Sequence, residues 1–268
     1  MVNHEDLVAR ARGGDREALE ALIRDMKDLV YGLAARMLGS PSDADDATQE
    51  ILIRLVTSLG TFRGESAFRT WVYRIASNHL LTARGKRAKL AAESFDELAT
   101  YLADGVASPV PPSEHALLIQ EAKLACTSTM LQCLDRDHRL AYILGEVLDL
   151  ASDEAAAILG IESDAFRKRL SRARTRMDEF LKTSCGLVDG GNACRCAKQG
   201  ANAEAHGRVS VDRLAWVHRV KQGKPGIVAE LAALERAVEV FRTELVAPEA
   251  VVEELRALIA GGELALLS

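Results

Sequence analysis

The chain has 268 residues, of which 48% are hydrophobic and 4% aromatic, and its formal net charge is −5. This negative charge excludes a protein that coats nucleic acid over its whole surface, so any DNA contact must come from local basic patches. The length suits two small domains with an appendage, and no window approaches the ~18–20 apolar residues that span a bilayer.

The first 90 residues contain three predicted amphipathic helices. Apolar residues recur at steps of three and four over Arg16–Leu38, and Gly39 and Pro41 follow directly. A second helix is expected to begin at Ser42, with the serine side chain as its cap and an acidic first turn. The third carries residues 68–76 inward and runs into a basic stretch at 84–89. Residues 1–90 therefore form a first helical domain.

The rest of the chain divides into a linker, a second helical unit and an extension. Residues 91–113 lose periodicity and end in a Pro/Ser cluster, which predicts a flexible linker. Helical patterns resume over 114–182, and a loop at 183–207 precedes further helical pattern from Val211 onward. The predicted fold class is all-α, with two small helical domains joined by the linker and a helical C-terminal extension at 183–268.

Residues 152–163 have the layout of a helix-turn-helix. Small residues stand where two helices must approach, Gly160 lies in the turn, and Ser163 is expected to cap the second helix. The apolar face of that second helix comprises Phe166, Leu170, Ala173, Met177 and Leu181. Its remaining surface carries six cations without an acid between them, namely Arg167, Lys168, Arg169, Arg172, Arg174 and Arg176. A solvated basic face is the alternative, but the turn and the charge together favour DNA binding.

Three segments in this order resemble the extracytoplasmic-function (ECF) class of RNA polymerase sigma factors. They are the acidic helix start at 43–50, the aromatic segment at 62–78, and the helix-turn-helix that ends at residue 174. The resemblance covers residues 5–182. It implies a non-catalytic subunit that gives RNA polymerase its promoter specificity.

By this resemblance, Asp46, Gln49 and Glu50 dock on the clamp helices of the largest polymerase subunit. Stabilisation of the helix dipole by the same acidic residues is the alternative. In the third helix, the family melts the minus-ten promoter element and holds flipped bases, which need stacking partners and basic residues for phosphates. The candidate residues for this role are Trp71, Arg74, Asn78, Arg84, Lys86 and Arg87. Phe68 and Trp71 could instead serve only as core residues.

The second domain is expected, again by resemblance, to read the minus-thirty-five element. Its candidate contacts lie near the start of the recognition helix, at Ser163, Asp164, Arg167, Lys168 and Arg172. The chain departs from the family at two of these neighbouring positions, where Ala165 often aligns with Thr and Lys168 with a small polar residue. The promoter preference of the family therefore does not carry over.

Five cysteines without a leader pattern are typical of a reducing, cytoplasmic compartment. Cys185, Cys194 and Cys196 lie in a glycine-rich loop and could share one structural or sensory zinc ion, with Cys133 as the fourth ligand. Cys126, seven residues before Cys133, and His206 are alternative fourth ligands. Ordinary reduced thiols and a redox switch remain open readings.

The extension has a coiled-coil-like seam over residues 227–245 that is too short to stand alone, so we expect it to pack within the molecule and to regulate it. Core RNA polymerase and promoter DNA are the expected partners, with an anti-sigma factor or another regulatory protein left open, and no membrane. A helix-turn-helix activator that acts without polymerase is the rival interpretation. The chain has none of the phosphate-loop, zinc-protease or nucleophile-elbow motifs, so no enzyme and no required cofactor are expected.

Overall fold

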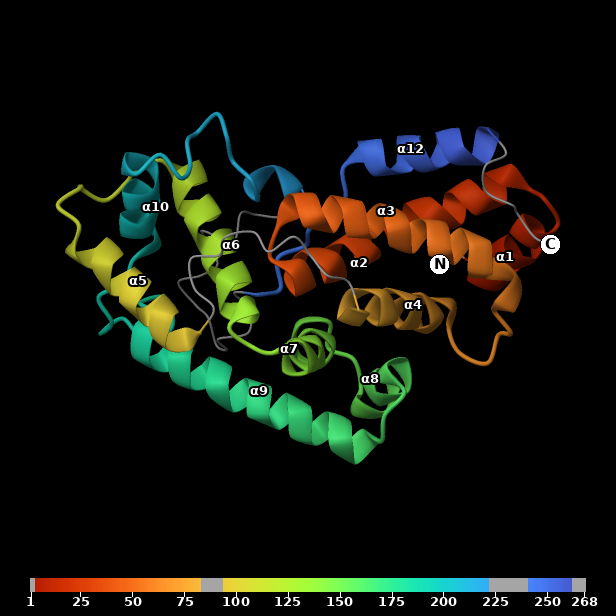
Figure 1. The fold of residues 1–268 in the computed structure, drawn as a ribbon, viewed down its shortest axis with the longest axis horizontal. Coiled ribbons are helices and arrows are strands. Elements are labelled where there is room, and N and C mark those ends of the chain that lie inside the picture. Colours follow the sequence, from red (N-terminus) through yellow and green to blue (C-terminus); the bar gives the residue numbers. More distant parts are fainter. Residues whose placement is uncertain (1–2, 83–93, 222–240, 262–268) are drawn as a thin grey trace.

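The computed structural model describes residues 3–82, 94–221 and 241–261, and its regular elements in these ranges are helical (Figure 1). The only β-pairing among these residues consists of two isolated bridges. The all-α prediction is confirmed. No helix within the same ranges is long and apolar enough to cross a membrane.

The N-terminal bundle comprises α1 (His4–Arg12), α2 (Arg16–Leu38), α3 (Pro41–Ser58), the short η1 (Leu59–Thr61) and α4 (Phe68–Thr82). Helix α2 begins and ends where the sequence predicts, with Asp15 as its cap and Gly39 in the left-handed conformation at its end. The cap of α3 differs from the prediction. Ser40, not Ser42, accepts the Asp43 amide, because Pro41 has no N–H and occupies the first helical position.

The second domain comprises α6 (Ala116–Gln132), α7 (Arg136–Tyr142), the π-helical turn η2 (Ile143–Val147), α8 (Ser152–Leu159) and α9 (Ser163–Ser184). The segment before it differs from a featureless linker, because it contains α5 (Phe95–Ala107) with Ser94 as cap. The Phe95 ring lies 5.1 Å from the Phe180 ring on α9. This part of the linker is therefore docked on the second domain.

The C-terminal extension is less helical than predicted. The expected loop at 183–207 contains α10 (Cys196–Ala205), whereas residues 207–221 and 242–248 contain only one short helical turn, η3 (Val217–Arg219). Helix α12 (Glu249–Ala260) follows. Most of the predicted seam at 227–245 lies outside the described residues, but its last members, Phe241 and Leu245, are buried as expected for packing within the molecule.

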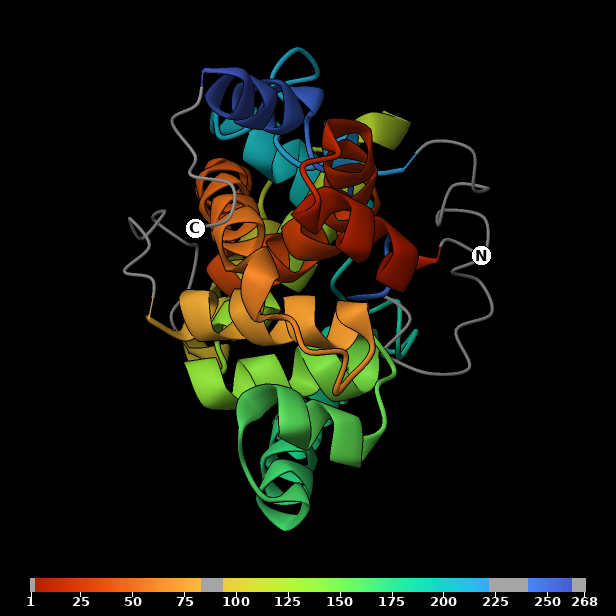
Figure 2. The ribbon, with the colours of Figure 1, turned by 90° about the vertical axis from the view of Figure 1, so that its right-hand side faces the viewer.

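The extension contacts both domains. Helix α12 lies along α3 and α2, while α10 packs against α6 and α5 (Figure 1). Viewed from the side, α12 and the α8–α9 pair are at opposite ends of the molecule (Figure 2). One continuous hydrophobic cluster joins the bundle, the second domain and the extension.

Candidate nucleic-acid interface

Helices α8 and α9 form the predicted helix-turn-helix. Gly160 ends α8 with a left-handed φ of 65°, a conformation that a residue with a side chain adopts only at a cost. The predicted apolar face of α9 is buried, with Phe166 completely enclosed. Ser163 does not act as the predicted cap; its Oγ donates to Asp153 Oδ1 at 2.6 Å and so ties the two helices together.

The positive charge on the basic face of α9 is partly neutralised by acidic residues of the same chain. Arg167 pairs with Asp164 of the same helix, and three further cations pair with acids outside α9, namely Arg169, Arg174 and Arg176. Although no acid lies between the six cations in sequence, only two of the six are therefore without an ionic partner in the described ranges. The Arg167 guanidinium also lowers the pKa of the Asp164 carboxyl, by hydrogen bond and by charge. Lys168 and Arg172 are exposed and form no ion pair with any residue in the described ranges. These two side chains offer the free positive charge for phosphates.

Helix α4 presents a second surface. Arg74 and Asn78 are exposed and share a helical face with Trp71, which is half-buried. The Trp71 ring lies 5.4 Å from the Phe62 ring and 5.6 Å from the Phe68 ring, within an aromatic cluster. Phe68 is a core residue, as the alternative interpretation expects, whereas Trp71 packs against the core and is partly exposed. Arg84, Lys86 and Arg87 lie outside the described residues.

The acidic side chains of α3 form a third surface. Asp46 and Glu50 are exposed one turn apart, and Gln49 is half-buried beside them. All three lie beyond the first helical turn, where the dipole effect has faded, so capping does not account for them. Asp45 points elsewhere and pairs with Arg219 of the extension at 2.7 Å.

The α4 and α8 helices are in direct contact. Thr70 Oγ1 donates to Glu154 Oε1 at 2.7 Å, and Thr70 and Tyr73 are buried. The sequence contains no signal for this contact, since it joins two side chains 84 residues apart in the chain. The helix-turn-helix is therefore docked on the bundle.

The cysteines gather differently from the prediction. Cys126, Cys185, Cys194 and Cys196 line one apolar pocket, together with Met130 and Phe180. Cys133, the predicted fourth ligand, does not line it; its Sγ donates to the Thr129 carbonyl at 3.3 Å. His206, the other alternative, also lies outside the pocket.

Burial and the neighbouring thiols raise the pKa of Cys126, and burial raises the pKa of Cys196 to about 11. Within the described ranges, no three thiol, imidazole or carboxylate groups stand at the spacing of metal ligands.

Comparison with known proteins matches two family models, described as Sigma-70 region 2 over residues 22–90 and Sigma-70, region 4 over residues 124–177. The RNA polymerase sigma-H factor of Pseudomonas aeruginosa is 32% identical over 182 residues, 66% of this chain and 93% of the relative. The ECF RNA polymerase sigma-E factor of Escherichia coli is 33% identical over 179 residues, with the same coverage.

Among solved structures, CnrH in complex with the cytosolic domain of CnrY matches with 24% identity and a TM-score of 0.49, over 66% of this chain and 95% of that chain. Both family models end before residue 178, so α10, the segments around 210–221 and 241–248, and α12 lie outside them.

Proposed function

Since the chain belongs to the ECF family of RNA polymerase sigma factors, we propose that it acts in the cytoplasm as a non-catalytic polymerase subunit that selects promoters and starts transcription. The observation that supports this most is that α4 and α9 expose basic and polar residues on two separate helical units, each within a matched family region. A lone helix-turn-helix activator is not favoured, because such a protein has no need of the region 2 bundle.

We assign polymerase docking to the α3 surface formed by Asp46, Gln49 and Glu50. Exposed carboxylates on a rigid helix suit a basic partner and steer its approach. Purified core polymerase should retain the wild-type chain in a pulldown and release the Asp46→Lys variant. Glu65→Lys, at an exposed loop position, is the control for a change of charge alone.

Promoter contact is assigned to Trp71, Arg74 and Asn78 on α4 for opened DNA, and to the start of α9 for duplex DNA. The α9 residues in this assignment are Ser163, Asp164, Arg167, Lys168 and Arg172. Asp164 acts on DNA indirectly, because it holds Arg167. Run-off transcription with core polymerase over a promoter library tests the whole proposal; a chain that neither binds core polymerase nor directs initiation would refute it.

We further propose that the thiol pocket takes a soft cation such as Zn²⁺, with Cys126 in place of Cys133. Four thiols line this pocket and match the ligand set of tetrahedral zinc, but they do not stand at ligand spacing in the structure, so their loop would have to close around the ion. Metal analysis of the purified chain should find ~1 ion per chain, lost in Cys126→Ser and kept in Cys133→Ser. If the purified wild-type protein is folded and contains no metal, the zinc proposal is wrong, and the cysteines are either ordinary reduced thiols or a redox switch.

The extension lies outside the family models, and we propose that it regulates the sigma factor. Its contacts with both domains support this role. A separate anti-sigma factor remains a compatible partner.

A further inference from the structure

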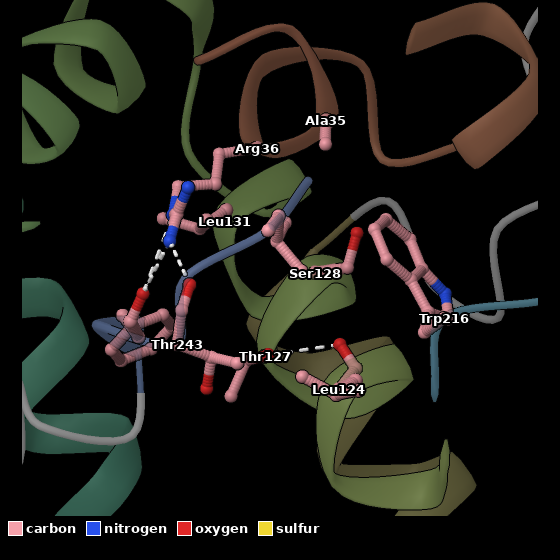
Figure 3. Close-up of a pocket in the computed structure, with 10 residues that line it drawn as sticks. Ala35, Arg36, Leu124, Thr127, Ser128, Leu131, Trp216 and Thr243 are labelled. Atoms are coloured by element: carbon pink, nitrogen blue, oxygen red, sulfur yellow. Dashed lines mark hydrogen bonds between the residues drawn. The ribbon is translucent and has the colours of Figure 1, made fainter. Parts of the chain in front are cut away.

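Two pieces of the extension, residues 214–221 and 241–247, form what we call the strap. They lie antiparallel, with the Lys221 amide 3.1 Å from the Glu244 carbonyl and the Val246 amide 2.8 Å from the Arg219 carbonyl. Side chains of α2, α6 and the strap line one small cavity between them (Figure 3). The strap therefore fills the seam between the N-terminal bundle and the second domain.

On the second domain, the strap is held by a buried carboxylate. Glu121 of α6 is 5% exposed. Its two oxygens accept the backbone amides of Ala215, Trp216 and Val217 at 2.8–3.1 Å. Hydrogen bonds to a charged acceptor are stronger than neutral ones. This arrangement seats the Trp216 ring in the cavity beside Ser128 and Leu124 (Figure 3).

On the bundle, the strap is held by the guanidinium of a half-buried arginine. Arg36 of α2 donates to the Thr243 carbonyl at 2.6 Å and to the Phe241 carbonyl at 3.2 Å (Figure 3). Burial lowers the pKa of Arg36 to about 10, and backbone carbonyls, the Gly32 carbonyl among them, are its hydrogen-bond acceptors. The strap thus supplies part of the hydrogen bonding that this half-buried cation requires.

One ion pair and one amide hydrogen bond also fix the strap to the bundle. Arg219 pairs with Asp45 on α3, and the Ala247 amide donates to Asp28 Oδ1 at 3.0 Å. Toward the helix-turn-helix, Arg242 donates to the Glu146 carbonyl at 2.8 Å. One segment therefore holds both domains at once, in the arrangement that places α8 on α4.

In this closed arrangement, the two DNA-binding surfaces are too close together to reach both promoter elements at once. The minus-ten and minus-thirty-five elements are about 25 base pairs apart, or ~85 Å at ~3.4 Å per pair. Because Glu154 of α8 bonds to Thr70 of α4, the recognition helix starts next to the bundle. Helix α9 has 22 residues, a length of ~33 Å. The surfaces on α4 and α9 can therefore bind their two promoter elements at the same time only after the two domains separate.

We infer that the strap is an autoinhibitory clamp, which closes the two promoter-binding domains on each other through Glu121 and Arg36. The inference rests on the proposed function for its effect on transcription, but the closure itself is a separate property of the chain. Release of the strap opens the molecule and exposes Thr70 and Tyr73 on α4.

The test uses the full chain with Glu121→Gln, which keeps the shape of the side chain but removes the charge that three amides share. Glu114→Gln, an exposed change just before the same helix, is the matched control. Trp216→Ala is a second, independent release variant. Circular dichroism verifies that helix content is retained, small-angle X-ray scattering measures the radius of gyration, and run-off transcription measures activity.

We expect both release variants to be more extended than the wild type and to transcribe about tenfold more at equal, limiting concentration, as the loss of charged hydrogen bonds implies. Glu114→Gln should match the wild type. Release variants that stay compact, or that extend without a gain over an active wild type, overturn the inference. If no chain, wild type or variant, supports transcription, the proposed function fails, and the scattering data alone then decide whether the strap closes the molecule.

Discussion

The helices of the N-terminal bundle meet through fully buried aliphatic side chains such as Leu22 and Leu52, whereas the strap adds hydrogen bonds and ion pairs to a few buried side chains such as Phe241. The free energy gained by burying aliphatic side chains is proportional to the apolar area removed from water, and water offers no contact that replaces it. Polar contacts exchange with water at a small net cost. We therefore expect the strap to detach from the bundle at a lower free-energy cost than the helices of the bundle detach from one another.

The sharpest way to break this comparison is to remove the same side chain from the bundle and from α12, the helix that follows the strap. Leu22 on α2 and Leu255 on α12 are both fully buried. Leu22→Ala should lower the free energy of unfolding by ~3–5 kcal/mol, because it leaves a cavity in the bundle core. Leu255→Ala should instead release α12 and leave the main urea transition nearly unchanged. Equal shifts of that transition would show that the extension is part of one cooperative core.

A second variant tests whether every polar anchor is weak. Arg139 on α7 is buried and donates to four carbonyls, including Met37 of α2 at 2.6 Å and Leu134 at 2.8 Å. Arg139→Met leaves these acceptors unsatisfied and should cost ~2–4 kcal/mol in urea unfolding. Exposed Arg172→Met is the control. A cost below that of the control would mean that water replaces the guanidinium.

Periodicity in the sequence predicts α2, α3 and α4 of the bundle and the helix-turn-helix, but it does not predict α1. The bounds of α2 and the left-handed Gly160 follow from local rules that the chain obeys within a few residues. The choice between Cys126 and Cys133 does not, because residues seven apart share a helix face and only the docked extension distinguishes them. Glu121 was likewise unpredictable, since its partners are amides almost 100 residues away.

The basic face of α9 permits a finer comparison within one helix. Arg172 has no ionic partner in the described ranges, whereas Arg174 pairs with Glu146. In the assembled holoenzyme, Arg172→Ala should weaken promoter binding a few-fold and reduce the salt dependence by ~1 unit of slope. Arg174→Ala should change the slope less. Identical slopes for the two variants would show that the Glu146 pair opens on DNA at no cost.

The smallest expected effect concerns His79, which is buried at the junction of α4 and α3. Burial, and then Arg54, lower the pKa of His79, while Glu50, 3.5 Å away, opposes them. A base with a lower pKa in the folded state binds its proton more readily when unfolded, so stability is present above pH ~6.5 and declines as the pH falls through that value. His79→Gln should lose less stability than the wild type between pH 7.5 and 5.5 in urea unfolding. A steeper loss in the variant would mean that the Glu50 pair dominates, and that acid stabilises the docking surface on α3.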